Sequence, residues 1–415
     1  MDLSVDSGTY IRLSAVMFLQ YAVWGAWAPV LAARLLGPLK MTGKQTGWIY
    51  ATLPIACIVS PLASGLLADK YMNTEWVLAI SHALGAVLLF LAVRQQTFRG
   101  LFAVMLLYSL CYGATLPLAN AVLFAHVSDL GTQGKVFIWA PIAWALVGYF
   151  LTGWRTVRGG EGDGSDCLML AAFLSVLMAV ACCLAPATPP TGATEIPIVK
   201  AFGMLAQPDF LIFIITSMVV GGLMQFYFLG SARFMIDMGI SGKNVPATMG
   251  IAQAAQAIAT YFFLEMMVET VGFKGALTIG AGFWLLMYLV YVGTKPRWLI
   301  ITSQTFHGLA YVFFMIVGQI FAGKVGPHIP ASMQALIFAA TSGVGLFLGT
   351  QLAGIVMDRY SVAGQFQWRK IWTVPLLIMA AGTLVLATVF QAQLPAPEAA
   401  PAAEQAAAEI SVTAS

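Results

Sequence analysis

The stretch Phe18–Trp27 reads FLQYAVWGAW and places a glutamine inside an apolar segment, five residues before a glycine. About half a chain later, Leu223–Arg233 reads LMQFYFLGSAR and repeats this arrangement with Gln225 and Gly230. A carboxamide surrounded by lipid needs hydrogen-bond partners, because an unpaired amide in an apolar medium costs several kcal/mol. The repetition predicts two related halves that face a shared polar cavity, which is the plan of a secondary transporter.

Composition places the chain in a membrane. Of the 415 residues 60% are hydrophobic and 9% are charged, whereas a soluble domain carries about 25% charged residues. No soluble fold could bury that much apolar surface, so the bilayer must be the solvent. The five cysteines lack metal-ligand spacing and are expected to pack within apolar runs. The basic residues are scattered singly through the predicted loops, and no nucleic-acid partner is expected.

Twelve apolar runs come close to the ~20 residues that cross the hydrocarbon core. They span 10–34, 46–68, 76–94, 101–127, 137–154, 167–187, 210–232, 246–268, 274–293, 299–322, 331–356 and 370–391. We therefore predict an all-α membrane protein with twelve transmembrane helices in two six-helix bundles. The predicted parts are an N-terminal bundle (1–188), a cytoplasmic linker whose prolines break helices (189–209), a C-terminal bundle (210–392) and a disordered tail (393–415).

The two halves repeat each other at a nearly constant offset. Gln20 and Gln225 lie 205 residues apart, and the glycine pair Gly148/Gly153 recurs 201 residues later as Gly349/Gly354. Parallel repeats of six helices are typical of the major facilitator superfamily.

A possible conformational latch follows the second run. The segment Gly65-Leu-Leu-Ala-Asp69-Lys70 resembles the cytoplasmic signature G-x-x-x-D-[RK] of that superfamily, although Tyr71-Met72-Asn73 departs from its continuation. The glycine permits close helix approach, and the aspartate can accept from helix N-terminal amides or a basic partner across the interface between bundles. The alternative is an ordinary loop charge pair, worth about 0–1 kcal/mol.

The distribution of basic residues and the aspartate loop favour opposite orientations of the chain in the membrane. With both termini cytoplasmic, six of the 20 Lys and Arg residues fall on the inner side, and the positive-inside rule favours the reverse. We place both termini in the cytoplasm on the strength of the aspartate loop.

Three stretches resemble the nucleoside:proton symporter family of the major facilitator superfamily: Phe18–Trp27, Gly65–Ala86 and Thr115–Val122. The likeness is close over most of the N-terminal half and follows helix order in the C-terminal half. It implies a monomeric transporter of the bacterial inner membrane that moves nucleosides, with proton symport, by alternating access. We expect no cofactor and no metal.

The resemblance also implies a binding site between the bundles. Gln225 and Gln253 match family positions that hydrogen-bond the nucleoside, and Trp144 and Phe228 fall at site positions that suit a planar base. A carboxamide has the donors and acceptors to read ribose hydroxyls or a base edge. The alternative for each glutamine is a hydrogen bond between helices, worth about 0.6–2 kcal/mol. For Gln20 the two readings are evenly balanced.

The chain departs from the family at charged positions. Phe137 stands where the family has an arginine, Gln256 replaces a glutamate, and Val312 replaces an aspartate. His307 and Tyr311 stand where the family has a tyrosine and a phenylalanine. A neutral nucleoside can bind without these charges, whereas proton coupling needs a titratable group that water reaches.

His307 is the one ionisable residue near the middle of a second-half run, and an imidazole with an ordinary pKa near 6.5 would suit proton carriage. The alternative is a neutral imidazole hydrogen-bonded to a neighbouring helix. Asn120 is expected at mid-depth, and Gln253 and Gln256 share a helical face at i,i+3. The full predicted site is Gln20, Asn120, Phe137, Trp144, Gln225, Phe228, Gln253, Gln256, His307 and Tyr311.

Enzyme signatures are missing from the sequence: there is no P-loop, no metal-ligand histidine set and no serine nucleophile elbow. We therefore expect neither catalysis nor ATP-driven transport. Two alternatives to a proton-coupled nucleoside transporter stay open. One is a facilitative transporter of nucleosides, sugars or another polyol, and the other is a non-transporting membrane sensor with the same fold.

Overall fold

The structure is a computed structural model that describes residues 4–36, 38–41, 43–158, 163–191, 197–240, 245–362 and 365–394. Almost all of these residues are helical, because a chain in lipid must satisfy its backbone hydrogen bonds internally. The N-terminal bundle contains α1 (Ser7–Trp27), α2 (Leu31–Leu36), α3 (Gly43–Lys70), α4 (Thr74–Val93), α5 (Phe98–His126), α6 (Leu130–Phe137), α7 (Trp139–Val157) and α8 (Asp166–Leu184).

The C-terminal bundle has more interruptions. Its elements are α10 (Pro208–Asp237), α11 (Val245–Phe262), α12 (Leu264–Gly293), α13 (Arg297–Thr302), α14 (Gln304–Ala310), η3 (Tyr311–Ile316), α15 (Val317–Val325), α16 (Pro330–Phe338), η4 (Ala339–Gly345), α17 (Leu346–Arg359) and α18 (Trp368–Thr388). The segments η3 and η4 are π-helical, a form often found at functional sites. A small antiparallel pair, β1 (Ser361–Val362) and β2 (Gln365–Phe366), joins α17 to α18.

The linker contains helix where we expected proline to prevent it. It holds α9 (Pro197–Gly203) and the 3₁₀ turn η1 (Met204–Ala206), and α9 packs against α3 and α16. Pro197 occupies the first position of α9, where the missing N–H has no intrahelical role. Residues 395–415 of the tail lie outside the described residues, so the disorder that we predict for the tail stays a prediction.

Every predicted apolar run falls on a helix or on consecutive helices, which confirms the all-α membrane fold. Among the described residues ten segments are long and apolar enough to cross a bilayer. The segments α1 and α11 occupy the places of the first and eighth runs but are not among the ten. Arg12 and Gln20 lower the hydropathy of α1, and Gln253 and Gln256 lower that of α11.

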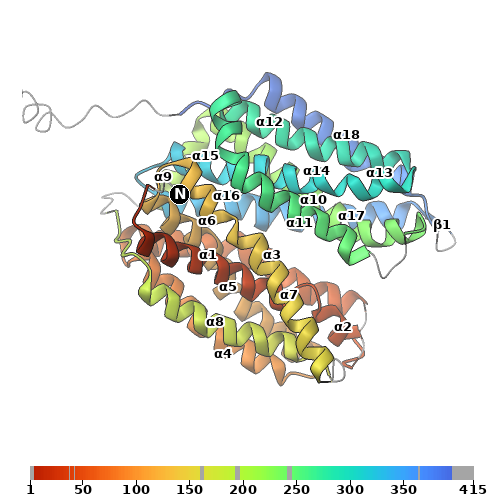
Figure 1. Ribbon diagram of the computed structural model, residues 1–415, viewed down its shortest axis with the longest axis horizontal. Helices are drawn as coiled ribbons and strands as arrows, with labels where there is room; N and C mark the ends of the chain where they lie inside the picture. The colour runs from red at the N-terminus through yellow and green to blue at the C-terminus, as the bar shows by residue number, and fades with distance from the viewer. Residues whose placement is uncertain are drawn as a thin grey trace, which may run out of the picture.

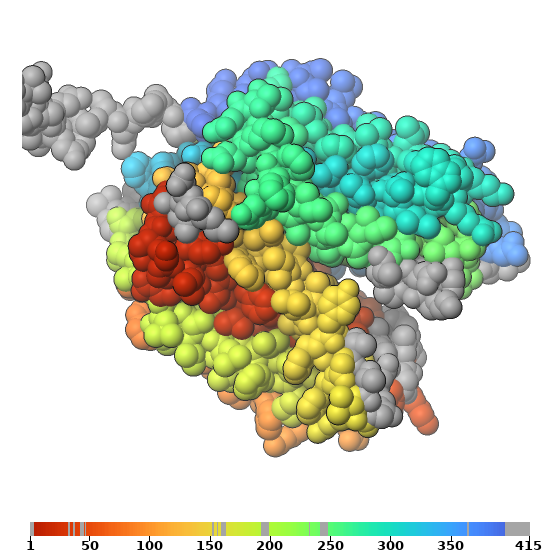
Figure 2. Space-filling view, viewed as in Figure 1, coloured from red at the N-terminus to blue at the C-terminus, as the bar shows by residue number. Residues whose placement is uncertain are grey.

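The bundles meet along two sets of helices. On one side α3 and α5 pack on α16, and α3 also packs on η4; on the other side α6 and α7 pack on α11. Figure 1 shows the bundles side by side at the end that holds α9 and diverging toward the end that holds α2 and β1. In Figure 2 the yellow surface of α7 meets the green surface of the C-terminal bundle, and a notch separates the two lobes toward the right.

Asp69 connects the bundles at the end where they meet. Its Oδ1 accepts from the backbone amide of Ala331 (3.2 Å), and its Oδ2 accepts from that of Ser332 (2.7 Å). These amides belong to the first turn of α16, where N–H groups lack intrahelical partners and attract negative charge. Gly65 allows the close approach, since a Cβ there would lie 3.0 Å from the Ala335 Cβ and 3.1 Å from the Ala331 oxygen.

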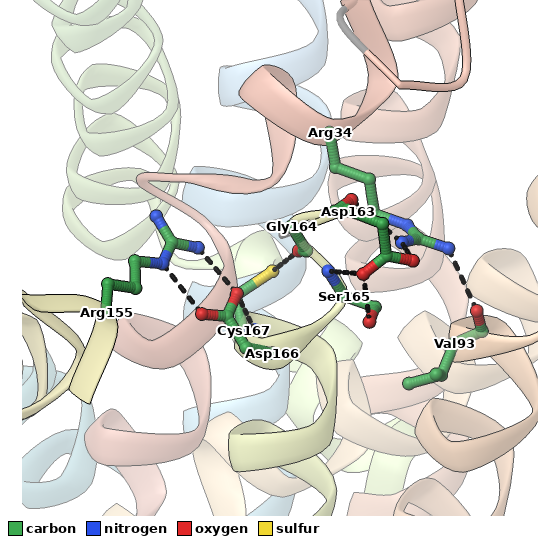
Figure 3. A network of polar contacts seen from close by, with 8 residues as sticks. All are labelled: Arg34, Val93, Arg155, Asp163, Gly164, Ser165, Asp166 and Cys167. Carbon is green, nitrogen blue, oxygen red and sulfur yellow. Dashed lines mark hydrogen bonds and ion pairs between the residues drawn. The ribbon is translucent and has the colours of Figure 1, made fainter. Parts of the chain in front are cut away.

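A polar clasp joins the ends of α2, α4, α7 and α8 (Figure 3). The buried guanidinium of Arg34 donates to the Asp163 carboxylate, to the Asp163 carbonyl (3.0 Å) and to the Val93 carbonyl (2.9 Å). Beside it, Arg155 forms a bidentate ion pair with Asp166 (2.7 and 2.8 Å). The clasp therefore fixes four helix ends on the side where the bundles diverge.

We expect Asp163→Asn to lower the melting temperature of the purified protein, because the buried Arg34 loses its carboxylate partner at a cost of about 1–3 kcal/mol. The Ser165 hydroxyl, and with it Arg34, lowers the pKa of Asp163 to about 2, against ~3.9 in an unfolded chain. The stabilisation is therefore complete above about pH 4 and is lost as pH falls toward 2. The difference in melting temperature between the wild type and Asp163→Asn should be constant from pH 5 to 8. Asp358→Asn, at an exposed position, is the control. Equal melting temperatures of the wild type and Asp163→Asn would contradict the clasp.

We expect Asp69→Asn to loosen the start of α16, because hydrogen bonds to a carboxylate are worth about 1.5–3 kcal/mol. Amide hydrogen exchange of the peptide that contains residues 331 and 332 should accelerate roughly tenfold or more. Lys70→Gln is the matched control: its ammonium lies over the Tyr71 ring, 5.6 Å from the centroid, and not against α16. Similar exchange in the wild type and Asp69→Asn would remove Asp69 from the contact.

Candidate functional site

Three polar residues of the C-terminal bundle lie at a common depth. Gln225 is 12 residues from the end of α10, Gln253 is eight from the start of α11, and His307 is ten from the start of α13. At 1.5 Å per residue these positions lie about 12–18 Å from the end where the bundles diverge. That depth is near the middle of a ~30 Å hydrocarbon core.

The glutamines at this depth keep their amides free. Gln225 and Gln253 are partly exposed and Gln256 is buried except for a small fraction. None of the three side chains has a hydrogen-bond partner among the described residues. Their amide nitrogens and oxygens are also absent from the side-chain atoms that are both buried and without a partner, so these atoms are not fully buried. Because an amide shut into apolar packing would be costly, these groups must reach accessible space. They can donate to and accept from a bound molecule.

His307 is held from two directions. The indole Nε1 of Trp284 donates to its Nδ1 (3.0 Å), and the Tyr227 ring stacks on the imidazole with centroids 3.9 Å apart. Tyr227 is itself fixed, because its hydroxyl donates to Gln304 Oε1 (2.9 Å). Phe228 lies 6.0 Å from the imidazole, edge to face, and is 56% exposed. The site thus combines a fixed imidazole with an exposed aromatic ring.

Close backbone packing joins the helix that carries His307 to α11. A Cβ at Gly308 would lie 2.2 Å from the backbone oxygen of Ala252 and 2.7 Å from the backbone nitrogen of Gln256. Only glycine allows α14 to approach α11 this closely. Helix α14 therefore packs directly on the helix that carries Gln253 and Gln256.

The N-terminal bundle contributes aromatic side chains. Trp144 of α7 is partly exposed and packs edge to face on Trp24 of α1, with centroids 5.2 Å apart. Gly25 makes room for it, since a Cβ there would lie 3.2 Å from the Trp144 Cα. Tyr311 of η3 is close enough to Tyr21 of α1 for the two phenols to interact electrostatically.

Gln20, unlike Gln225, is completely enclosed. Its Nε2 donates to the Thr115 hydroxyl (2.8 Å), which itself donates to the Tyr112 carbonyl (2.7 Å). The Gln20 Oε1 therefore faces His82 Nε2, which donates to it (2.9 Å). His82 in turn contacts Ser175 of α8 (3.1 Å). In this conformation Gln20 ties four helices together and reaches no accessible space.

Two more predicted residues are buried here. Asn120 donates to Gln319 Oε1 of α15 (2.8 Å) and so links the two bundles. Phe137 is 3% exposed and packs on Phe124, with centroids 5.9 Å apart. Of the predicted site residues, the structure brings Phe228 and His307 into contact. Gln225 lies three residues before Phe228 on α10, and Gln253 and Gln256 lie on α11, which packs on α14.

Residues that the sequence did not single out hold the site in place. Trp284 fixes the imidazole, Gln304 fixes Tyr227, and Gln319 pairs with Asn120. A tryptophan within an apolar run carries no sequence signal of its own. Gln304 and Gln319, two polar residues in the tenth run, are as unusual in a membrane helix as Gln225 and could have been noticed on that ground.

Comparison with known proteins matches residues 7–394 to the family model described as Nucleoside H+ symporter. Nucleoside permease NupG of Escherichia coli K12 is 29% identical over 401 residues, covering 92% of this chain and 95% of the permease. A crystal structure of nucleoside transporter NupG superimposes with a TM-score of 0.68 at 24% identity, covering 92% of this chain and 99% of that one.

The fold extends beyond this family. The major facilitator superfamily transporter FucP, crystallised in the outward conformation, superimposes with a TM-score of 0.72 at 12% identity, covering 91% of this chain and 97% of FucP. The two-bundle architecture is therefore that of the major facilitator superfamily. Since the family model spans almost the whole chain, the protein belongs to the nucleoside H⁺ symporter family.

Proposed function

We propose that this protein carries nucleosides across the membrane by alternating access and holds them between its two bundles. The observation that carries the proposal is the group of three glutamines at mid-depth whose amides have no partner among the described residues. A neutral ligand rich in hydroxyls and ring heteroatoms matches such amides. The family and the name of the relative NupG, a nucleoside permease, support the same substrate class.

Each residue has a proposed role. Gln225, Gln253 and Gln256 read hydroxyls or base edges through paired donors and acceptors. Phe228 offers an exposed face on which a base stacks. Trp144 and Tyr311 close the site from the sides of α7 and η3.

Alternating access would use the contact between α3 and α16. Gly65 and Asp69 form a latch that holds the bundles together at one end while the other end stays open, and Lys70 follows them at the end of α3. With both termini in the cytoplasm of a bacterial cell, the latched end is the inner one, and this conformation faces outward. The site is complete within one chain, in keeping with a monomer in the inner membrane.

Coupling to protons is the mode that the family name indicates. Uncoupled transport is the second candidate, because Gln256 and the buried Val312 stand where the sequence resemblance places carboxylates. The two modes differ in whether a proton gradient drives accumulation.

Uptake of labelled uridine and adenosine into proteoliposomes tests both. We expect accumulation above equilibrium when the outside is acidic relative to the lumen, and equilibration only when a protonophore removes the gradient. Equal uptake with and without the gradient would establish the uncoupled mode. Absence of uptake and of counterflow in correctly folded protein would contradict nucleoside transport.

The two repeated glutamines should respond differently to the same substitution. Gln225→Ala should weaken nucleoside binding about tenfold or more with an unchanged melting temperature, because its amide has no partner to lose among the described residues. Gln20→Ala should lower the melting temperature, because it strands the Thr115 and His82 groups at a cost of about 1–3 kcal/mol. Both are measured on purified protein, and an unchanged affinity in Gln225→Ala would remove that residue from the site.

A further inference from the structure

Trp284 decides which nitrogen of His307 carries a hydrogen. An indole Nε1 can only donate, and it points at Nδ1 from 3.0 Å. Nδ1 must therefore present its lone pair, and the hydrogen of the neutral ring must reside on Nε2. Protonation of Nδ1 would set two N–H groups against each other at this distance and would cost a buried hydrogen bond.

The surroundings of His307 provide nothing to offset that cost. The titratable groups that face it are phenols, Tyr227 stacked on the ring and Tyr311 one turn along the segment. α11 contributes Gln256 and α12 contributes Trp284. Among the described residues no carboxylate pairs with the imidazole, and the residue is 4% exposed. An imidazolium here would be a buried charge without a counter-charge, which is expensive.

The second ring nitrogen of His307, Nε2, is available to donate a hydrogen bond. Nε2 has no hydrogen-bond partner among the described residues. It is also absent from the side-chain atoms that are both fully buried and without a partner, so it is not fully buried. The small exposed part of His307 therefore includes Nε2, and the exposed ring of Phe228 lies edge to face with the imidazole. Stacking on Tyr227 and the bond from Trp284 leave the ring one orientation.

We infer that Trp284 is a positioning residue that keeps His307 neutral, with Nε2–H aimed at the site as a fixed donor to an acceptor atom of the ligand. His307 then reads the substrate and does not carry the coupling proton. The identity of the ligand as a nucleoside rests on the proposed function, whereas the state of the imidazole does not.

The state of the ring is measured without a ligand. In full-length protein with ¹⁵N-labelled histidine, reconstituted in bilayers, the His307 signals are identified by their loss in His307→Gln. We expect a bare Nδ1 and a protonated Nε2 that stay unchanged from pH 5.5 to 8.0. In Trp284→Phe we expect the ring to stay neutral but to populate both tautomers, because Nδ1 no longer faces a donor. Titration of His307 in the wild type, or a single Nε2–H tautomer retained in Trp284→Phe, would overturn the inference.

Binding of labelled uridine and adenosine tests the role of the donor. His307→Gln keeps an N–H donor that does not titrate and should bind within about threefold of the wild type, whereas His307→Phe should lose about tenfold or more. In Trp284→Phe the affinity should fall about twofold or more at every pH from 5.5 to 8.0, because the released neutral ring bears its hydrogen on Nε2 only part of the time. The double variant Trp284→Phe/His307→Gln should bind as His307→Gln does, since it has no imidazole to position.

The outcomes separate the two claims. Equal affinity of His307→Phe and wild type would exclude the donor role even where the NMR result holds. If the wild type binds neither nucleoside while its His307 shows the locked tautomer, the substrate assignment fails and the positioning role of Trp284 stands. Melting temperature and monodispersity of each variant exclude misfolding as the cause.

Discussion

Each polar side chain placed in lipid must find a partner, and this constraint shapes both halves of the molecule. The repeated glutamines meet it in opposite ways. Gln20 is enclosed, and Thr115 and His82 satisfy its amide. Gln225 has no partner among the described residues and retains access to space outside the protein packing. The two glutamines, which share a sequence pattern, are thus enclosed in the first bundle and partly exposed in the second.

The same constraint explains how the bundles can separate without a large penalty. The carboxylate of Asp69 and the amide of Asn120 have partners across the interface, the first turn of α16 and Gln319. If the bundles part as proposed, water can replace these partners for the Asp69 carboxylate and for the Asn120 Nδ2 group. Because protein and water hydrogen bonds nearly cancel, the net difference is small, and a ligand of modest binding energy can shift the balance.

Much of the fold could be predicted because lipid imposes simple rules on a sequence. Length and hydropathy located all twelve runs, and the glycine–aspartate segment indicated a contact at helix N-terminal amides, where Asp69 in fact lies. The interruptions of the tenth and eleventh runs by η3 and η4 had no sequence signal, since π-helical stretches depend on packing against neighbours. The sequence does not predict helix α9, because a proline usually breaks a helix, whereas Pro197 stands at the first position of α9.

The site was harder to predict than the fold, since a polar residue in a membrane helix shows that a partner exists without showing which. Gln20 and Gln225 have the same local sequence pattern, and what distinguishes them is that Thr115 of α5 and His82 of α4 reach Gln20. Likewise, nothing in the run that contains Trp284 indicates that its indole reaches His307. The family resemblance indicates which positions to expect in the site, whereas the contacts of these residues depend on the three-dimensional arrangement.

The absence of formal charge from the proposed site has a consequence for energetics. In the proposed site, glutamine amides, aromatic rings and a neutral imidazole would bind a neutral nucleoside without moving charge through the membrane, where one elementary charge is worth about 2.3 kcal/mol per 100 mV. The substrate-binding step would then be insensitive to membrane potential. Any voltage dependence of transport must arise from the coupling ion and from a titratable group other than His307. Substrate recognition and energy coupling would thus reside in different residues, which allows the family carboxylates to be lost from the site while the amides that face the ligand remain.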